Sequence, residues 1–376
     1  MTRGLRGRAK PALPGHIEAA LANEDRRVPA DRLRGVSARI FSAAGSSDTE
    51  AGIVAHHLVE ASLKGHDSHG VIRVGKYVDW VRAGHLLPNR HAEIVYDRGP
   101  LLIVEGGFGY GQVIGCEAMD LAADRARQHG MCCAAIRNAG HLGRIGAWAE
   151  QLARRGLVSV HFVNTSGFGI LVAPHGGSDR RLSANPIAAG TPVAGKPPLI
   201  LDIATALVAE GKIQVARNRG KALEPGVVID GAGRPTTDPE AFYAAPPGAI
   251  FPLGGHKGSG LSLFCEILAG SLTGGRSSHP ENPTAWRLVN NMMTIAFDPA
   301  AFPDAGFAAD AERLIAWIKA SPPLESGGRV LLPGEVEAET MADRLEKGVP
   351  IDAATLRQLG QAARALGVAM PEDLAR

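Results

Sequence analysis

Residues 101–137 read LLIVEGGFGYGQVIGCEAMDLAADRARQHGMCCAAIR, which is an apolar run, a helical pattern and a second apolar run. Leu101–Glu105 and Ala134–Arg137 are typical of buried strands, and Val113–His129 has the apolar spacing of a helix. The same alternation continues downstream, with strands expected at Val158–Val163, Leu199–Asp202 and Asn291–Phe297 and a helix at Ile145–Arg155. Strands that alternate with helices predict an α/β or α+β core.

The segments on both sides of this core have helical patterns. Upstream, Val28–Ala83 is helical, and Ser47-Asp-Thr-Glu50 is a candidate capping box for its second helix. Within the core region a further helix is expected at Leu261–Leu272, and downstream of the core helices are expected at Ala309–Ala320 and Ala353–Leu366. We therefore expect a helical domain of residues 29–95 with 300–376, a central sheet domain of residues 96–299 that carries the cofactor site, and an arginine-rich disordered extension at residues 1–28.

The composition is typical of a soluble globular protein. The 376 residues include 40 Lys+Arg and 38 Asp+Glu, a formal net charge of +2, and 45% of them are hydrophobic. A near-zero charge argues against nucleic-acid binding, and no apolar run reaches the roughly 18–20 residues that span a membrane. The four cysteines form neither a Cys-x-x-Cys pair nor a disulfide framework, which favours a reducing, cytoplasmic location.

Two glycine-rich segments are similar to nucleotide-binding loops but do not match them. Gly107-Phe-Gly-Tyr-Gly111 lacks the Rossmann spacing, in which the third glycine comes three positions after the second. Gly254-Gly-His-Lys-Gly-Ser-Gly260 lacks the Walker order, but its backbone amides precede a helix and Lys257 adds a positive charge. An ordinary Rossmann fold and an ATP site are therefore disfavoured, whereas the second segment suits an anion.

The run Gly65-His-Asp-Ser-His-Gly70 contains side chains that can carry chemistry. Ser68 and His69 are neighbours in sequence, and adjacent side chains rarely form a nucleophile–base pair facing one substrate. His66 and His69 have a spacing that suits a metal ion, but no third ligand follows at an obvious distance, so we expect no metal centre.

Several motifs, in the same order along the chain, resemble the malate/L-lactate dehydrogenase type 2 family. The first is His66-Asp-Ser-His-Gly-Val-Ile-Arg73 with Tyr77 after it. The others are Asn138–Gly146, Asn185-Pro-Ile-Ala, Leu201-Asp-Ile-Ala-Thr205, Gly233–Pro239, Gly255-His-Lys-Gly258 and Leu332-Pro-Gly-Glu335. The resemblance covers about residues 30–370.

This resemblance implies an oxidoreductase that interconverts 2-hydroxy acids and 2-keto acids with NAD or NADP. It also implies a non-Rossmann fold with a mixed, largely antiparallel central sheet, and a homodimer. The residues that it assigns to the cofactor are His141, Leu142, Gly143, Arg144, Ile145, Asp202, Ile203, Ala204, Gly254, Gly255, His256, Lys257, Pro333, Gly334 and Glu335. They are far apart in the sequence, so the fold must bring them together in a cleft between domains.

The resemblance also assigns catalytic roles. His69 matches the acid–base histidine, and a histidine with its ordinary pKa of about 6.5 exchanges protons at neutral pH. Ser68 would orient His69 or relay protons to it, and His141 is the second candidate for the acid–base role. Arg73 would lie one turn after His69 if the helix begins there, and its planar fork suits a bidentate grip on the substrate carboxylate. Ala184 and Asn185 would contact the substrate.

Two departures from the family pattern affect substrate preference. Ala184 replaces a threonine that can contact substrate, and Lys212 stands where some reductases of the family place a relay aspartate. The resemblance therefore predicts the type of reaction better than it predicts the substrate. Two alternatives stay open: an NADPH-dependent cyclic-imine reductase of the piperideine-2-carboxylate type, and a cofactor-binding protein that has lost catalysis.

Overall fold

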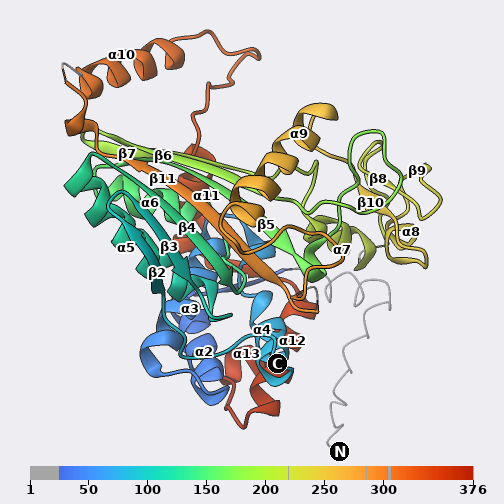
Figure 1. The fold of residues 1–376 in the computed structure, drawn as a ribbon. Helices are drawn as coiled ribbons and strands as arrows, with labels where there is room; N and C mark the ends of the chain where they lie inside the picture. Colours follow the sequence, from blue (N-terminus) through green and yellow to red (C-terminus); the bar gives the residue numbers. More distant parts are fainter. Residues whose placement is uncertain (1–24, 219, 285, 304–305, 376) are drawn as a thin grey trace, which may run out of the picture.

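The computed structural model describes residues 25–218, 220–284, 286–303 and 306–375, and a seven-stranded sheet forms its centre (Figure 1). The strand order is β2-β3-β4-β11-β5-β6-β7. The strands are β2 (Glu93–Arg98), β3 (Leu101–Glu105), β4 (Met131–Ala139), β5 (Val158–Ser166), β6 (Ile187–Val193), β7 (Lys196–Ile203) and β11 (Val289–Phe297). Among these described strands, β3 and β4 are the one parallel pair, so the sheet is mixed and largely antiparallel, as expected.

The parallel pair comes from the predicted strand–helix–strand unit, because parallel neighbours need a crossover. Helix α5 (Gly111–His129) connects β3 to β4. A Cβ atom added at Gly111 would lie 2.4 Å from the carbonyl oxygen of His141. The glycine at the end of the Gly107–Gly111 loop therefore permits close packing of two backbone segments.

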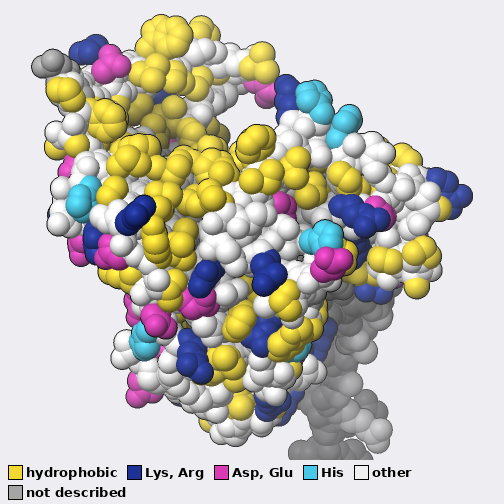
Figure 2. All heavy atoms as spheres, viewed as in Figure 1, with side chains coloured by type: hydrophobic (Ala, Val, Ile, Leu, Met, Phe, Trp, Pro, Cys, Tyr) yellow, Lys and Arg dark blue, Asp and Glu magenta, His cyan; other side chains and the backbone are white. Residues whose placement is uncertain are grey.

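Helices cover one face of the sheet. Apolar side chains of α5 and α6 (Gly146–Arg154) pack with alternate residues of the strands, such as Cys132, Ala134 and Ile136. In the view of Figure 2, hydrophobic side chains gather over the strands and over the helix that begins at His256. Exposed apolar residues of these elements include Met131, Leu201, Leu263, Phe264 and Ile267.

A helical unit lies beside the sheet (Figure 1). It contains α2 (Ala30–Ala43), α3 (Asp48–Leu63), α4 (Arg73–Arg82), α11 (Glu335–Lys347), α12 (Ala353–Ala365) and α13 (Glu372–Ala375). The Ser47 hydroxyl accepts a hydrogen bond from the backbone amide of Glu50 at 3.2 Å, as the predicted capping box requires. The Glu50 carboxylate instead accepts the amide of Asn89 at 2.9 Å, so one half of the capping box is absent.

The expected disordered extension is wrong at its last residues. β1 (Arg26–Val28) pairs antiparallel with β12 (Val349–Ile351), and Val28 is buried in the helical core. A strand this short is stable because its partner strand and the helical core cover it. The local sequence does not reveal either of these contacts. The rest of that prediction, residues 1–24, lies outside the described residues.

Only part of the segment 300–376 packs with the N-terminal helices, as α11–α13 do. After the short turn η4 (Pro299–Ala301), helix α10 (Phe307–Lys319) stands at the far end of the sheet, away from α2–α4 (Figure 1). Leu314 and Trp317 of this helix are 53% and 76% exposed. Helical spacing predicted the helix correctly, but its packing partner depends on the path of the chain around the sheet.

A small subdomain interrupts the expected central domain. It contains α7 (Glu210–Asn218), β8 (Val228–Ile229), β9 (Pro235–Thr236), α8 (Pro239–Tyr243) and β10 (Ala249–Ile250), with a core of its own. Helix α9 (His256–Cys265) follows and continues as a π-helix, η3 (Glu266–Ser271), so the predicted apolar helix begins earlier than expected. No described helix is long and apolar enough to cross a membrane.

Candidate active site

His69 lies at the end of a 3-10 turn, η1 (Asp67–His69), shortly after α3. Gly65, with φ +84°, ends α3 in the left-handed conformation that glycine favours. A Cβ atom at Gly70 would lie 2.0 Å from Ser62 Oγ, so this position also requires glycine. Within the turn, Ser68 Oγ lies 3.0 Å from His69 Nδ1, and the serine is in position to orient the imidazole.

Arg73 is the first residue of α4, so His69 and Arg73 do not share a helix. Its Nε donates to the Ser68 carbonyl at 2.6 Å, and this hydrogen bond, not helical spacing, holds the guanidinium beside His69. No carboxylate among the described residues forms an ion pair with Arg73, which leaves the cation free for an anionic ligand.

His141 stacks on His69. The ring centroids are 5.4 Å apart and the ring planes differ by 12°. Gln112 Nε2 donates to the Tyr77 hydroxyl at 2.9 Å, and the Tyr77 oxygen lies 2.7 Å from His141 Nδ1. If the Tyr77 hydroxyl donates to Nδ1, the proton of neutral His141 is on Nε2. Sequence reasoning gave Tyr77 and Gln112 no role, although Tyr77 follows Arg73 by one helical turn.

Both histidines are neutral near pH 7 in this arrangement. Burial lowers the pKa of His69 to about 3, and the positive charges of Arg73 and His66 act in the same direction. Burial and the charge of Arg73 lower the pKa of His141 well below its ordinary value. The fold half-buries this imidazole beside a cation, which is the physical reason for a pKa below the ordinary value that the sequence alone suggests.

Two segments assigned to the cofactor meet at the start of α6. The Gly146 amide donates to Asp202 Oδ2 at 2.7 Å, which joins the end of β7 to the loop His141–Ile145. The Leu142 amide donates to Asn290 Oδ1 at 2.8 Å and fixes the same loop to β11. Burial raises the pKa of the Asp202 carboxyl, against the opposing effects of His66 and Arg144.

The other assigned segments lie along β7 and the chain that follows it. A Cβ atom at Gly258 would lie 2.6 Å from the Thr205 carbonyl oxygen, so the start of α9 packs against the segment that follows Asp202–Ala204. The Ile200 amide donates to the Pro333 carbonyl at 3.3 Å, which brings Pro333-Gly334 to β7. The fold thus gathers four segments that are distant in sequence.

Three assigned residues are placed differently from expectation. Asn185 is fully buried and its amide is used within the scaffold, accepting from Thr165 N and Ser183 Oγ and donating to Glu266 Oε1. The side chain of Asn185 therefore has no hydrogen-bonding group left to bind a substrate. Glu335, the first residue of α11, pairs at 2.8 Å with Lys319, the last residue of α10. Arg144 is buried and pairs with Glu150 at 2.9 Å, so its guanidinium is not open to a phosphate.

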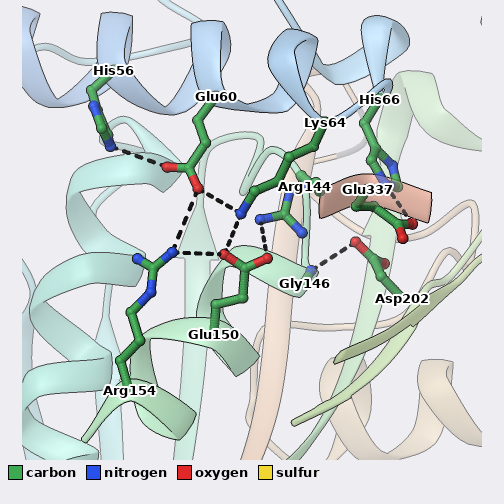
Figure 3. A network of polar contacts seen from close by, with 10 residues as sticks. All are labelled: His56, Glu60, Lys64, His66, Arg144, Gly146, Glu150, Arg154, Asp202 and Glu337. Atoms are coloured by element: carbon green, nitrogen blue, oxygen red, sulfur yellow. Dashed lines mark hydrogen bonds and ion pairs between the residues drawn. The ribbon is translucent and has the colours of Figure 1, made fainter. Parts of the chain in front are cut away.

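A buried ion network joins the helical unit to the sheet domain beside this site (Figure 3). Lys64, directly after α3, pairs with Glu60 of α3 at 2.7 Å and also with Glu150 of α6. Glu150 pairs in addition with Arg144 and with Arg154. The network fixes α3, which leads to His69, against the loop that carries His141. Sequence reasoning missed it, although Glu60 and Lys64 have the i, i+4 spacing of a helical ion pair.

Two stacked histidines beside an arginine without a carboxylate partner among the described residues combine groups that can exchange protons with a group that can bind an anion. The chain belongs to the malate/L-lactate dehydrogenase family, whose model matches residues 28–360. It is therefore an oxidoreductase, and the family resemblance of its motifs is confirmed.

The relatives include dehydrogenases and an imine reductase. The chain is 40% identical over 351 residues to hydroxycarboxylate dehydrogenase B of Escherichia coli (strain K12), covering 92% of this chain and 96% of that protein. It is 33% identical over 333 residues to a Δ1-pyrroline-2-carboxylate/Δ1-piperideine-2-carboxylate reductase of Pseudomonas syringae pv. tomato, covering 86% and 93%. The structure of malate dehydrogenase from Pyrococcus horikoshii OT3 superposes with a TM-score of 0.81 at 33% identity, covering 92% of this chain and 97% of that one.

Proposed function

We propose that this protein oxidises 2-hydroxy acids and reduces 2-keto acids at the His69–His141–Arg73 site with NAD or NADP. The observation that carries the proposal is the stacked, neutral pair of imidazoles beside an arginine without a carboxylate partner in the described part of the chain. Arg73 binds the substrate carboxylate through its planar fork. That anchor places the substrate hydroxyl or carbonyl group at the two histidines.

The two histidines have different tasks. His69 accepts the hydroxyl proton in oxidation and returns it in reduction, with Ser68 orienting the ring through Nδ1. His141 carries its proton on Nε2 and donates a hydrogen bond to the substrate oxygen. A proton-transfer role for His141 as a base would instead require its other tautomer, in which Nδ1–H donates to the Tyr77 oxygen and Nε2 is free. The carboxylate of a bound substrate offsets the charge of Arg73, which favours protonation of His69 during reduction.

The residues present fit a dinucleotide. When bound, the cofactor supplies the hydride acceptor or donor. Gly254 and Gly255 both have positive φ and precede α9, so unhindered backbone amides and Lys257 suit its phosphates. The loop His141–Ile145, the segment Asp202–Ala204 and Pro333-Gly334 would hold the remainder. The Asp202 carboxylate, which accepts the Gly146 amide, would bind a hydroxyl group of the cofactor.

A substrate screen tests the function. Purified protein should oxidise NADH or NADPH with one or more 2-keto acids, and substitution of Arg73 by alanine should raise KM for each of them, because every substrate shares the anchoring carboxylate. Absorbance at the reduced-nicotinamide band is the measurement, with each cofactor supplied separately. Turnover of Δ1-piperideine-2-carboxylate with NADPH and of no keto acid would instead favour the cyclic-imine reductase. Binding of neither cofactor would contradict both.

We also propose that two copies pack through the apolar face described above. Phe264 is 60% exposed on α9, and Phe302 and Trp317 are 54% and 76% exposed near and on α10. Apolar surface of this extent on a soluble protein marks an interaction site. A second copy supplies the matching apolar face, because a twofold contact pairs a surface with itself.

Light scattering should therefore give twice the chain mass of 39.3 kDa. Substitution of Phe264 by aspartate should shift the protein toward the monomer, because a charge would be buried in the contact. Leu345, which is 55% exposed on α11, is the matched control, and its substitution by aspartate should leave the mass unchanged. A fully active wild-type monomer would contradict this proposal.

We propose a cytoplasmic location. Cys116, Cys132, Cys133 and Cys265 are all free thiols. Free cysteines are typical of reducing compartments, whereas small secreted proteins use cysteines in disulfides.

A further inference from the structure

Arg287, just before β11, is a buried cation without an acidic partner among the described residues. It is 7% exposed, and its guanidinium carbon lies 4.0 Å from the ring centre of Phe108 and 3.9 Å from that of Trp286. Its Nε and Nη1 atoms are buried and have no hydrogen-bond acceptor in the described part of the chain. Burial also lowers the pKa of Arg287. Leaving a buried cationic donor unsatisfied is costly, so a ligand with an acceptor group would stabilise this arrangement.

A second unpartnered polar atom lies in the same cluster. His85 Nδ1 is buried without a hydrogen-bond partner among the described residues. The His85 ring is 5.2 Å from the ring of Trp286 and 5.4 Å from that of Phe168. Trp286 and Phe168 are 50% and 49% exposed. Buried polar atoms therefore lie next to an accessible aromatic surface.

The cluster lies at the end of the sheet where the active-site loop begins. Phe108 follows β3 and its amide donates to the Asn138 carbonyl at 2.7 Å. Val289, two residues after Arg287, pairs with Ser166 at the end of β5, and Asn290 pairs with Ala139 at the end of β4. His141 follows that same end of β4. No role in the proposed reaction uses any residue of the cluster.

We propose that Arg287, His85, Phe108, Phe168 and Trp286 form a binding site for a small organic acid with an aryl-sized apolar body, separate from the carboxylate site at Arg73. Phe108 and Trp286 both lie against the guanidinium, so a ligand would approach its edge. That edge presents N–H groups in one plane, which is the geometry that matches a carboxylate. Trp286 and Phe168 supply the apolar contact for the rest of the ligand. The inference does not depend on the proposed reaction.

Tryptophan fluorescence of the full chain provides the test, because Trp286 stacks on the guanidinium. Titration with phenylacetate should change the emission. Acetate, which lacks the ring, and 2-phenylethanol, which lacks the charge, should each bind at least ~10-fold more weakly, as loss of a charged hydrogen bond or of an apolar contact predicts. Calorimetry gives the same dissociation constants without relying on the tryptophan. In the Trp286→Phe variant, heat of binding should remain while the emission change is lost.

Variants of Arg287 separate a site from a structural role. Arg287→Met should weaken phenylacetate binding at least ~10-fold and should not lower the melting temperature, because it removes an unsatisfied buried cation. Arg287→Lys should recover part of the binding, since it keeps the charge but loses the planar fork. Arg357, an exposed arginine of α12, is the matched control, and Arg357→Met should bind as the wild type does.

Three outcomes would overturn the proposal. The first is equal binding of phenylacetate to wild type and Arg287→Met. The second is equal affinity for phenylacetate and 2-phenylethanol, which would indicate an apolar patch only. The third is dissociation of a dimer in Arg287→Met with no response to the acid in the wild type, which would assign Arg287 to the contact between copies. None of these results bears on turnover of keto acids, so the two proposals fail independently.

Discussion

Substitution of His69 by alanine should lower kcat by roughly 10²–10⁴-fold, the range expected for loss of general acid–base catalysis. Proton exchange with the substrate oxygen occurs in the transition state, so KM should change less than kcat. His141→Ala should lower kcat as well, through loss of a hydrogen bond to that oxygen and of the stacking that holds His69. Steady-state kinetics of both variants, with cofactor affinity measured separately, compare the two roles.

The pH profile tests the lowered pKa of His69. Because burial lowers the pKa of His69 to about 3, its basic form is almost fully present above about pH 5. The kcat/KM for oxidation should therefore lose little from this group between about pH 8 and about pH 5, whereas an imidazole with the ordinary pKa of about 6.5 would lose most of its basic form. If His69→Ala keeps near-normal kcat while His141→Ala abolishes turnover with the cofactor still bound, the acid–base role belongs to His141.

Substitution of Glu150 by glutamine should lower the free energy of unfolding by about 3–5 kcal/mol, as breaking a buried ion pair does. Glu150 is buried and faces Lys64, Arg144 and Arg154 (Figure 3). The neutral amide would leave Lys64 with Glu60 alone and buried Arg144 without a carboxylate. Urea denaturation measures the change.

A matched surface pair provides the control. Glu240 pairs with Arg217 at 2.9 Å and its side chain is 62% exposed, so Glu240→Gln should leave the unfolding midpoint unchanged. Equal effects of the two substitutions would contradict the view that burial makes the Glu150 network important. Because α3 and the His141 loop meet through this network, Glu150→Gln should also lower activity at temperatures where the variant remains folded.

The periodicity of apolar residues correctly predicted those helices and strands whose packing partners are close in the sequence. The run 101–137 gave β3, α5 and β4 correctly, because strand and helix periods differ and the parallel pair needs the helix between its strands. The Ser47 cap was predicted for the same reason, since its hydroxyl reaches an amide three residues away. The short strands β8, β9 and β10 were missed because two residues carry no detectable period.

The sequence by itself determined the family and the residue types of the active site, because the motifs around His69, Arg73 and His141 are contiguous and ordered along the chain. Only the tertiary structure decided what those residues can do. Desolvation and charge depend on neighbours from distant segments, and they make His69 a neutral imidazole. In the same way, Glu150 forms an ion pair with the guanidinium of Arg144, and the side-chain amide of Asn185 donates hydrogen bonds to Glu266 and Ser262. No local pattern encodes these partners, because the energy of a buried polar group is fixed by which group the fold places beside it.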